Sequence, residues 1–208
     1  MFNDRKDAGR KLALKIKKSL KYNDYNIVAI VRGGVVVGKA VANSLKAKLS
    51  IIIIRKIGAP NNQELAIGAV GSGGIIYWDD DLIERLNIKS RYKLQIKDEK
   101  FEEIKKLEKI FNTKKGLDLK DKRVIIVDDG VATGATVICA QKVVKRHKPK
   151  EIVLAVPVIS EESLESIKKY FDKVIVLKIA KDFSAVGQFY KSFPQVKNGI
   201  VIKTLSNQ

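Results

Sequence analysis

Two adjacent carboxylates, Asp128 and Asp129, stand between an apolar run and a loop made almost wholly of Gly, Ala and Thr. The run at residues 124–127 holds only β-branched side chains, and a helical pattern follows the loop at residues 130–136. In such a loop, small side chains let backbone N–H groups converge on an anion, while the next helix presents its positive N-terminal end. Two threonine hydroxyls add further donors. The loop is therefore predicted to hold a phosphate.

The same residues exclude two familiar phosphate loops. No Gly-Lys-Ser or Gly-Lys-Thr follows residues 130–136, and the glycine spacing differs from the dinucleotide fingerprint. Asp128 and Asp129 would repel a phosphate, so we expect them to face hydroxyl groups or a cation. A ribose 5-phosphate fits this arrangement, with its phosphate on the loop and two ring hydroxyls on the acids. An ordinary strand-to-helix turn with an Asp cap is the alternative, but it does not explain the apolar run, the acid pair and the threonines together.

Strand and helix patterns alternate around this loop. Short apolar runs predict buried strands at residues 27–31, 51–54, 124–127, 152–156 and 174–177. Apolar residues at helical spacing predict helices at residues 8–20, 37–49, 98–112, 135–145 and 161–170. Because the runs are apolar on both faces, the pattern predicts an α/β fold with a doubly wound, mostly parallel sheet.

Three further features define the organisation of the chain. Residues 65–70 and 75–78, separated by a glycine-rich turn, resemble a hairpin. No Pro-, Gly- or Ser-rich linker divides the chain, so we expect one domain over residues 1–208, with an insertion at about residues 71–115. Ligands of open parallel sheets collect at the carboxyl ends of the strands, where the residues from Arg32 to Gly34 and the phosphate loop both lie.

The formal net charge of +18 has three explanations: a nucleic-acid partner, an anionic small substrate, or a lysine-rich proteome. Between residues 97 and 122 lysines alternate with acids, which indicates a solvated, ion-paired helix face. A basic cluster at residues 142–150 suits either a helix end or a nucleic-acid patch. No apolar run approaches the roughly 20 residues that span a bilayer. Since the single Cys139 also cannot form an internal disulfide, we expect a cytoplasmic protein without a membrane segment.

Residues 124–136 resemble the phosphoribosyl-pyrophosphate signature of the type I phosphoribosyltransferases. Further segments resemble, in similar order, one subfamily of phosphoribosyltransferases whose acceptor is unassigned; they lie at residues 4–10, 31–35, 55–58, 64–70, 185–190 and 193–195. The resemblance covers nearly the whole chain. It implies the type I phosphoribosyltransferase fold, with a small hood segment that we expect to include residues 180–208.

The resemblance implies roles for the signature residues. Asp128 and Asp129 would hold the ribose hydroxyls and serve as catalytic residues. The 5-phosphate would lie on the loop, in contact with Gly130, Ala132, Thr133, Gly134, Ala135 and Thr136. Magnesium would be the cofactor, bound by donor oxygens and water, because the sequence has no dedicated all-protein cage and such ions commonly keep several waters.

The resemblance also implies which residues bind the leaving group, pyrophosphate. Arg32, Gly33 and Gly34 would form the pyrophosphate loop, with Arg32 as a catalytic residue, although Arg32 could equally be a surface charge. Arg55 and Lys56 follow the second predicted strand. They would supply positive charge to pyrophosphate, with Lys56 catalytic, or begin a mobile covering loop, or form a solvated strand end.

A covering loop is expected because water would otherwise compete with the acceptor. Its candidates are residues 57–63 and the long excursion at residues 71–115. Glu64, in the first of these connections, is a further candidate for a loop contact or a metal-linked role.

The acceptor would lie under the hood. Its candidate contacts are Phe183, Phe189 and Tyr190, whose rings could stack on a planar base, and Gln188, whose amide could read the edge of that base. Aromatic residues at this spacing also occur commonly in cores and interfaces.

Two classes of function follow. The first is an enzyme that transfers the phosphoribosyl group from phosphoribosyl pyrophosphate to a nitrogenous acceptor, such as a nucleobase, and releases pyrophosphate. The second is a regulator that senses phosphoribosyl pyrophosphate in the same pocket and binds nucleic acid through its basic surface. Hydrolysis of the donor by water is a third possibility. The expected partners are phosphoribosyl pyrophosphate, a small-molecule acceptor and, in a homodimer, a second copy of the chain.

Overall fold

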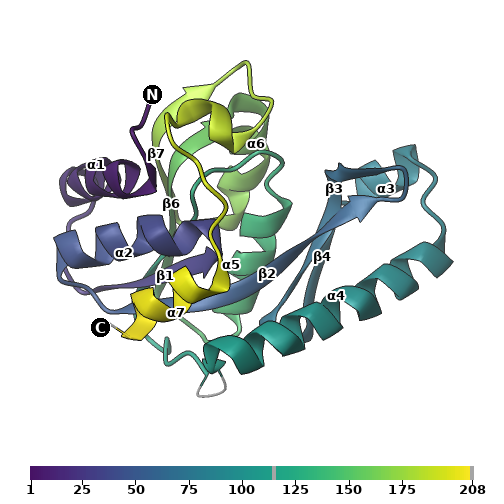
Figure 1. Cartoon of the computed structure of the whole chain (residues 1–208), viewed down its shortest axis with the longest axis horizontal. Coiled ribbons are helices and arrows are strands. Elements are labelled where there is room, and N and C mark those ends of the chain that lie inside the picture. The colour runs from purple at the N-terminus through teal and green to yellow at the C-terminus, as the bar shows by residue number, and fades with distance from the viewer. Residues whose placement is uncertain (114–115, 207–208) are drawn as a thin grey trace.

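A seven-stranded sheet forms the centre of the molecule, with the strand order β4-β3-β2-β1-β5-β6-β7 (Figure 1). The computed structural model describes residues 1–113 and 116–206. The strands are β1 (Tyr25–Val31), β2 (Leu49–Ala59), β3 (Asn62–Gly71), β4 (Ile75–Trp78), β5 (Arg123–Val127), β6 (Glu151–Ser160) and β7 (Lys173–Ala180). Neighbouring strands from β2 through β1 to β7 pair in parallel, whereas β3 pairs antiparallel with both β2 and β4. The predicted doubly wound, mostly parallel sheet is therefore confirmed.

Helices cover both faces of this sheet (Figure 1). They are α1 (Arg5–Ser19), α2 (Gly33–Leu45), α3 (Asp80–Arg85), α4 (Ser90–Phe111), α5 (Ala135–Lys145), α6 (Glu161–Ile167) and α7 (Asn198–Ser206). Along β1, Ile27 and Ala29 face a core shared with α1, α2, α4 and α7, while Val28 and Ile30 face a second core with α5 and α6. Because successive side chains of a strand point to opposite faces, burial of both faces explains the continuous apolar runs. Within the described residues, no helix has the length and apolar character needed to cross a membrane.

The predicted helices are found, but several have different ends. The helix predicted at residues 135–145 has the bounds observed for α5. The helix predicted at residues 37–49 is α2, which begins at Gly33 directly after β1 and ends at Leu45, because residue 49 already belongs to β2. The helix predicted at residues 98–112 is α4, which begins earlier, at Ser90, because Tyr92 and Ile96 also pack on the core.

Strands β2 and β3 extend beyond the parallel sheet as an antiparallel arm (Figure 1). The expectation that the second strand ends before Arg55 is wrong, because Arg55 and Lys56 lie inside β2. Residues 57–63 form the tip of the arm, where β2 turns into β3. Antiparallel pairing satisfies the backbone while one face meets solvent, so polar residues are tolerated in this part of the strand. The other candidate for a covering loop, residues 71–115, forms β4, α3 and α4; its last two positions lie outside the described residues.

Backbone hydrogen bonds join the N-terminal residues to the segment after β7. Phe2 N donates to Phe189 O at 2.8 Å, and Lys191 N donates to Phe2 O at 2.8 Å. Helix α7, which the sequence analysis did not predict, packs on α2 and α4. The residues assigned to the hood, 180–208, therefore form two separate parts, a segment beside β7 and a helix on one face of the sheet. Their role as a hood stays a prediction, and residues 207–208 lie outside the described part of the chain.

Candidate functional site

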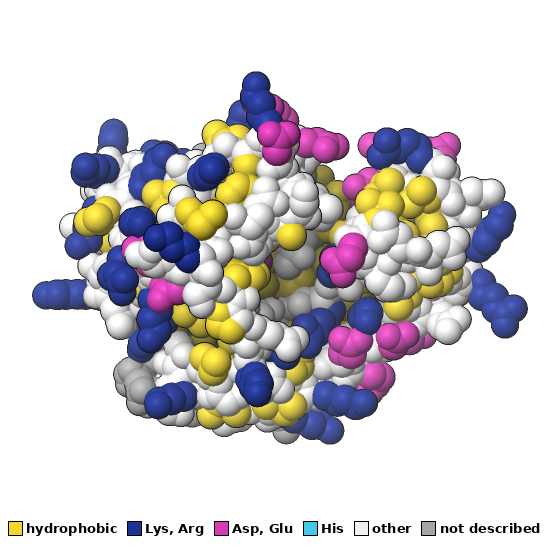
Figure 2. Space-filling model, turned by 45° about the horizontal axis from the view of Figure 1, so that its top comes forward, with side chains coloured by type: hydrophobic (Ala, Val, Ile, Leu, Met, Phe, Trp, Pro, Cys, Tyr) yellow, Lys and Arg dark blue, Asp and Glu magenta, His cyan; other side chains and the backbone are white. Residues whose placement is uncertain are grey.

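A cleft of about 790 Å³ lies at the carboxyl edge of the parallel strands. Its walls come from the loop after β5, the start of α6, the segment after β7 and the β2–β3 arm. Figure 2 shows the molecule hollowed between the main body and the arm. The predicted site residues that line the cleft are Lys56, Asp128, Gly130, Ala132, Thr133, Gly134, Thr136 and Phe183. Among the predicted loop residues, Ala135 is buried at the start of α5 rather than in the wall of the cleft.

The loop after β5 is held by hydrogen bonds to its neighbours. Val131 N donates to Val158 O at 2.9 Å, and the carbonyl of Ala132 accepts from Ser160 Oγ at 3.0 Å and from Ser163 Oγ at 2.5 Å. Gly134 has a φ of +85°, and a Cβ at this position would lie 2.8 Å from Ile167 Cγ2. Glycine is therefore required here both by the backbone conformation and by the space available. The result is a fixed loop that opens into the cleft and leads directly into α5.

The structure separates the two adjacent acids. Asp128 lines the cleft. The carboxylate of Asp129 accepts a hydrogen bond from Arg5 Nε at 2.8 Å, and its carbonyl accepts one from the Tyr190 hydroxyl at 2.6 Å. Asp129 N donates to Asp128 Oδ1 at 2.8 Å, so the backbone of Asp129 also orients the carboxylate of Asp128. Sequence reasoning gave both acids one role, but the structure shows only Asp128 among the residues that line the cleft.

Burial raises the pKa values of both acids of the pair. Burial, reinforced by the negative charge of Asp129, raises the pKa of the Asp128 carboxyl well above its usual range. Burial also raises the pKa of Asp129, while the Arg5 guanidinium opposes that shift. Asp128 thus lacks the cationic partner that Asp129 has. A cation or hydroxyl donors brought into the cleft would favour its charged form.

Arg5 is the residue with a structural role at the site that sequence reasoning missed. It is 8% exposed, and besides Asp129 its guanidinium donates to Pro194 O at 2.8 Å and lies 3.6 Å from the centre of the Phe193 ring. The adjacent Asp4 caps α1 by accepting a hydrogen bond from Asp7 N at 2.7 Å, which fixes the first turn that carries Arg5. The signal available in the sequence was a charged residue placed in a resembling segment, directly after the helix cap.

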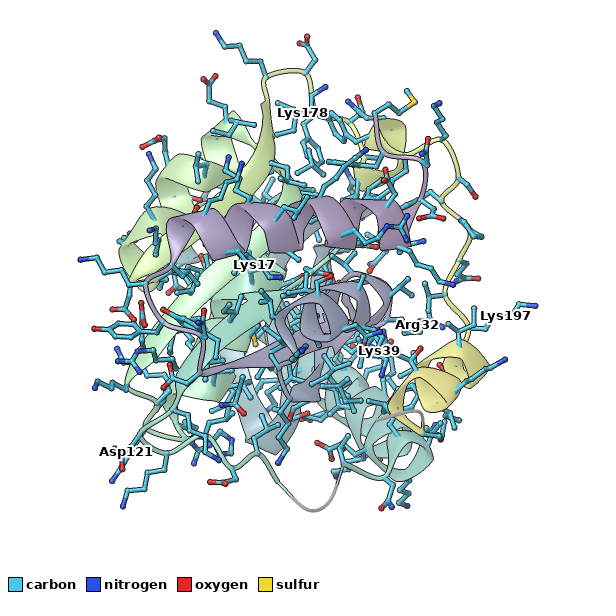
Figure 3. The ribbon with its side chains drawn as sticks, turned by 90° about the vertical axis from the view of Figure 1, so that its left-hand side faces the viewer. Lys17, Arg32, Lys39, Asp121, Lys178 and Lys197 are labelled. Carbon is cyan, nitrogen blue, oxygen red and sulfur yellow. The ribbon has the colours of Figure 1, made fainter. Side chains whose placement is uncertain are left out.

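The residues predicted to bind pyrophosphate begin at the end of β1. A Cβ on Gly33 would lie 1.9 Å from Asp129 Oδ2, and a Cβ on Gly34 would lie 2.7 Å from Val127 O. Both glycines therefore allow this turn to pack directly against the acid pair. Arg32 stands at the start of α2, after a cis peptide bond from Val31 (Figure 3). It does not line the cleft, so its predicted role at pyrophosphate stays a prediction.

The arm contributes two cations in different environments. Lys56 Nζ lies 3.0 Å from Glu64 Oε2, and both side chains line the cleft. Arg55 Nε lies 3.2 Å from Glu103 Oε2 of α4. Burial and the nearby positive charge of Arg32 lower the pKa of Arg55, while Glu103 opposes the shift. Lys56 is therefore the arm cation that faces the cleft, whereas Arg55 joins the arm to α4.

The predicted acceptor residues have unequal access to the cleft. Phe183 lines it, but Phe189 and Tyr190 are 6% and 5% exposed and pack in a small core with Phe2. The side chain of Gln188 binds its own loop, accepting from Ser184 N at 2.9 Å and donating to Asp182 O at 2.7 Å. In this arrangement the amide of Gln188 is occupied by backbone partners. The cleft wall near Phe183 instead contains polar residues that the sequence analysis did not single out, namely Ser160, Glu161, Glu162, Lys181 and Ser184.

The donor atoms of the site suit a magnesium ion that also has a substrate as ligand. Within the described part of the chain, no group of three or more His, Cys, Asp or Glu side chains is placed to hold a metal by itself. The cleft nevertheless contains four acids, Glu64, Asp128, Glu161 and Glu162, against two lysines. Asp128 is the half-buried acid among them that lacks a cationic partner. A hard cation that keeps waters and substrate oxygens as ligands would fit this set.

Comparisons with known proteins agree with this architecture. The family model of the phosphoribosyl transferase domain matches residues 2–192. "Putative phosphoribosyl transferase Rv0571c" of Mycobacterium tuberculosis (strain H37Rv) is 34% identical over 206 residues, which cover 99% of this chain and 46% of that protein. The chain thus spans about half the length of the curated relatives it matches.

Two solved structures are also similar to this chain. TT1426 from Thermus thermophilus is 34% identical, with a TM-score of 0.80 and coverage of 99% of this chain and 98% of that one. The purine phosphoribosyltransferase of Pyrococcus horikoshii is 19% identical and shares the fold at a TM-score of 0.50, with coverage of 91% and 90%.

Proposed function

Since the chain belongs to the phosphoribosyl transferase family, we propose that it transfers the 5-phosphoribosyl group from phosphoribosyl pyrophosphate to a nitrogenous acceptor and releases pyrophosphate. The observation that carries this proposal is the meeting of the phosphate loop, Asp128 and Lys56 in one cleft. A nucleobase is the acceptor class that we favour, because Phe183 offers the cleft an aromatic ring.

The loop after β5 binds the 5-phosphate of the donor. The Ala132 carbonyl is occupied by two serine hydroxyls of the α6 region, and the first turn of α5 leaves its N–H groups without helical acceptors. Thr133 and Thr136 add hydroxyl donors. The fixed backbone therefore provides donors without any reorganisation when the phosphate enters.

Asp128 acts on the ribose ring. Hydrogen bonds from the ribose hydroxyls to its carboxylate favour the charged form that burial otherwise opposes. As the bond from the anomeric carbon to the pyrophosphate oxygen breaks, positive charge develops on the ring, and the nearby carboxylate stabilises it. Asp129 supports this function indirectly, because its backbone N–H holds Asp128 Oδ1.

The arm and the turn after β1 act on the leaving group. Lys56 lies in the cleft wall and Arg32 at the start of α2, so both supply positive charge as pyrophosphate departs. The acceptor nitrogen attacks the anomeric carbon from the opposite face. When bound, magnesium would neutralise charge on the donor oxygens, with Asp128 and the acids of the cleft wall as its protein partners through water. The segment around Phe183 limits the access of water to the reacting carbon.

The homodimer and the cytoplasmic location expected from the sequence are part of the same proposal. Sedimentation analysis and cell fractionation would test them. The alternative, a sensor of phosphoribosyl pyrophosphate that binds nucleic acid, predicts donor binding without turnover.

The deciding experiment measures pyrophosphate release from phosphoribosyl pyrophosphate and magnesium across a panel of bases and amines. We expect release that depends on one acceptor and falls about 100-fold or more in Asp128→Asn, because the carboxylate that stabilises the transition state is lost. Asp121→Asn is the matched control, because Asp121 is exposed, does not line the cleft, and has a φ of 56° that Asn tolerates. Donor binding without release for any acceptor would favour the sensor, and the absence of donor binding would overturn the proposed site.

A further inference from the structure

The segments that lead into the parallel strands lie together at the edge of the sheet opposite the cleft. Strands β1, β2, β5, β6 and β7 all begin at this edge, because they pair in parallel and their first residues lie close to register. We call these segments the amino edge; they are residues 17–24, 46–48, 116–123, 145–151 and 168–173. Figure 3 labels Lys17, in the last turn of α1, and Asp121, before β5. The amino edge is therefore separate from the proposed donor site at the carboxyl ends of the strands.

The amino edge carries more than half of the net charge of the chain. Its segments make up 32 of the 208 residues but contain 15 of the 41 Lys and Arg residues and 5 of the 23 Asp and Glu residues, which gives +10 of the formal +18. Helices α1, α2, α5 and α6 end here, and each C-terminus contributes about half a negative elementary charge. The helix ends thus supply about −2, which is much smaller than +10 and leaves the surface positive.

The acids of the amino edge are paired with few of its cations. Three of the five acids form ion pairs, and their partners are only two cations: Asp24 and Glu151 contact Arg123 at 2.8 and 3.5 Å, and Asp118 contacts Lys122. Of the other two, Asp172 accepts a hydrogen bond from Ile152 N at 2.7 Å, and Asp121 is exposed. The acids therefore leave most of the lysines without a carboxylate partner.

Four lysines illustrate this excess of cations. Lys17, Lys21, Lys46 and Lys150 are exposed, and none of them forms an ion pair with a described residue. They come from three different segments of the amino edge. Five strands about 4.8 Å apart give this edge a length of roughly 20 Å. An extended positive surface of this length suits the repeated phosphates of a polyanion better than one small anion.

A cavity of about 450 Å³ lies at the amino edge between the ends of α1 and α2. Lys17, Lys46 and Asn23 belong to its lining, and no acid occurs among the described lining residues. Tyr22 also lines the cavity and is 53% exposed, and Arg123 Cζ lies 3.6 Å from the centre of its ring. In single-stranded nucleic acids, bases stack on such exposed rings while the phosphates follow the neighbouring cations.

A membrane surface fits the amino edge less well than a nucleic acid does. Of the large hydrophobic residues that are exposed in the described chain, Tyr22 alone lies in the amino edge. Helices that bind at a membrane interface combine cations with several apolar side chains that enter the lipid. One aromatic ring beside a cavity is instead typical of base stacking.

We propose that the amino edge binds a single-stranded nucleic acid, with one base in the cavity beside Tyr22 and the backbone phosphates along the exposed lysines. This binding goes beyond the proposed transferase function and does not depend on it, because the two ligands use opposite edges of the sheet. It also differs from the sensor alternative, since it requires neither the donor nor a loss of turnover.

The test measures binding of a fluorescein-labelled oligouridylate of about 12 nucleotides to the full chain by fluorescence anisotropy. Saturating phosphoribosyl pyrophosphate and magnesium are present, so that the donor cleft is filled. We expect Lys21→Glu/Lys150→Glu to weaken binding about tenfold or more, because each reversal replaces attraction of a phosphate with repulsion. The control Lys191→Glu/Lys197→Glu makes the same change in net charge at exposed loop positions outside the amino edge and outside both cavities. It should bind like the unmodified protein, and thermal unfolding checks that both variants are folded.

A second pair of variants tests the stacking of a base. Tyr22→Ala removes the exposed ring and should weaken binding about fivefold or more, which is the usual effect of losing one stacked base. Tyr22→Phe keeps the ring and should bind like the unmodified protein. Equal losses in the two variants would contradict stacking. Oligothymidylate of the same length extends the assay to DNA, and the strand that binds more tightly identifies the source of the ligand.

Four results would overturn the proposal. The first is no binding of either strand at a salt concentration of about 100 mM. The second is equal weakening in both double variants, which would mean general attraction by net charge. The third is tighter binding of a duplex of the same length, whose paired bases cannot enter the cavity. The fourth is tighter binding to vesicles of phosphatidylserine and phosphatidylcholine that Lys21→Glu/Lys150→Glu also weakens, which would make the amino edge a membrane contact.

Discussion

The cleft and the surface between α1, α2 and α7 both contain cationic side chains, but they are built from different parts of the chain. In the cleft, four acids face two lysines beside a backbone loop that follows the end of a strand. Between α1, α2 and α7, cationic side chains such as Arg10 and Lys203 lie on helix surfaces. The side chains of the cleft are therefore positioned by backbone geometry and by hydrogen bonds, whereas Arg10 and Lys203 are exposed. Substitutions in these two regions should therefore affect stability and ligand binding to different extents.

The largest effect is expected at Arg5. Arg5→Ala removes the ion pair with Asp129 and leaves a half-buried carboxylate without its partner, so we expect a loss of about 3 kcal/mol in the free energy of unfolding. Chemical denaturation of the free protein measures this loss, and calorimetry should show weaker binding of the donor.

Arg10 supplies the matched control for that change. It lies on the same helix but is exposed. Arg10→Ala should alter the free energy of unfolding by less than about 0.5 kcal/mol, as is usual for surface positions. If the two variants were equally stable, the contrast between a positioned cation and a solvated one would be wrong.

An intermediate effect is expected at Gly134. Gly134→Ala places a Cβ 2.8 Å from Ile167 Cγ2 at a φ of +85°, so we expect a loss of about 2 kcal/mol in stability and weaker binding of the donor. Thermal unfolding and donor titration measure the two effects. Gly199 of α7 has open space around it, and Gly199→Ala should change neither measurement appreciably. Normal donor binding by Gly134→Ala would argue against the loop as the phosphate site.

The smallest expected effect is a gain in the stability of the folded protein rather than a loss. The folded protein raises the pKa of Asp128, so at a pH above that raised pKa the charged carboxyl destabilises the fold. Asp128→Asn removes this charge and keeps an oxygen for Asp129 N, so the variant should be more stable than the unmodified protein by on the order of 1 kcal/mol at about pH 8.

The gain should disappear as the pH falls through the raised pKa towards about pH 4, where the carboxyl of the unmodified protein becomes neutral. Thermal unfolding of the donor-free protein at a series of pH values measures the difference. Asp129→Asn serves as the comparison and should gain less stability than Asp128→Asn, because Arg5 opposes the rise in the pKa of Asp129 and loses its charged partner in the variant. A variant Asp128→Asn that is less stable than the unmodified protein at every pH would contradict the assignment of an unbalanced charge to Asp128.

Much of the fold could be predicted because burial on both faces of the sheet leaves continuous apolar runs. The loop after β5 was predictable because Gly134 and its small neighbours satisfy a local backbone requirement. Local requirements of this kind are visible in a short stretch of sequence. The predicted bounds of α5 agree with the observed bounds for the same reason, because the loop ends where the helix begins.

Other features depend on contacts between distant segments. The arm could not be predicted because Arg55 and Lys56 lie in β2 only through pairing with β3. The different surroundings of Asp128 and Asp129 depend on Arg5, which approaches Asp129 only in the folded chain. The sequence does contain a helical pattern for α7, because Val201 and Leu205 share one helix face after Asn198.

The hydrogen bonds between Phe2 and the segment around Phe189 have a consequence for the order of assembly. Arg5 contacts both Asp129 and the Pro194 carbonyl, and the Tyr190 hydroxyl donates to Asp129 O, so the contacts that support the acid pair join three segments that are far apart in sequence. Contacts of such high sequence separation form late, because loop closure must occur before they contribute. A chain emerging from the ribosome can therefore form β1, β2 and β5 well before Asp129 acquires its cation, and the site becomes complete only when residues 189–194 are free to fold against the first turn of α1.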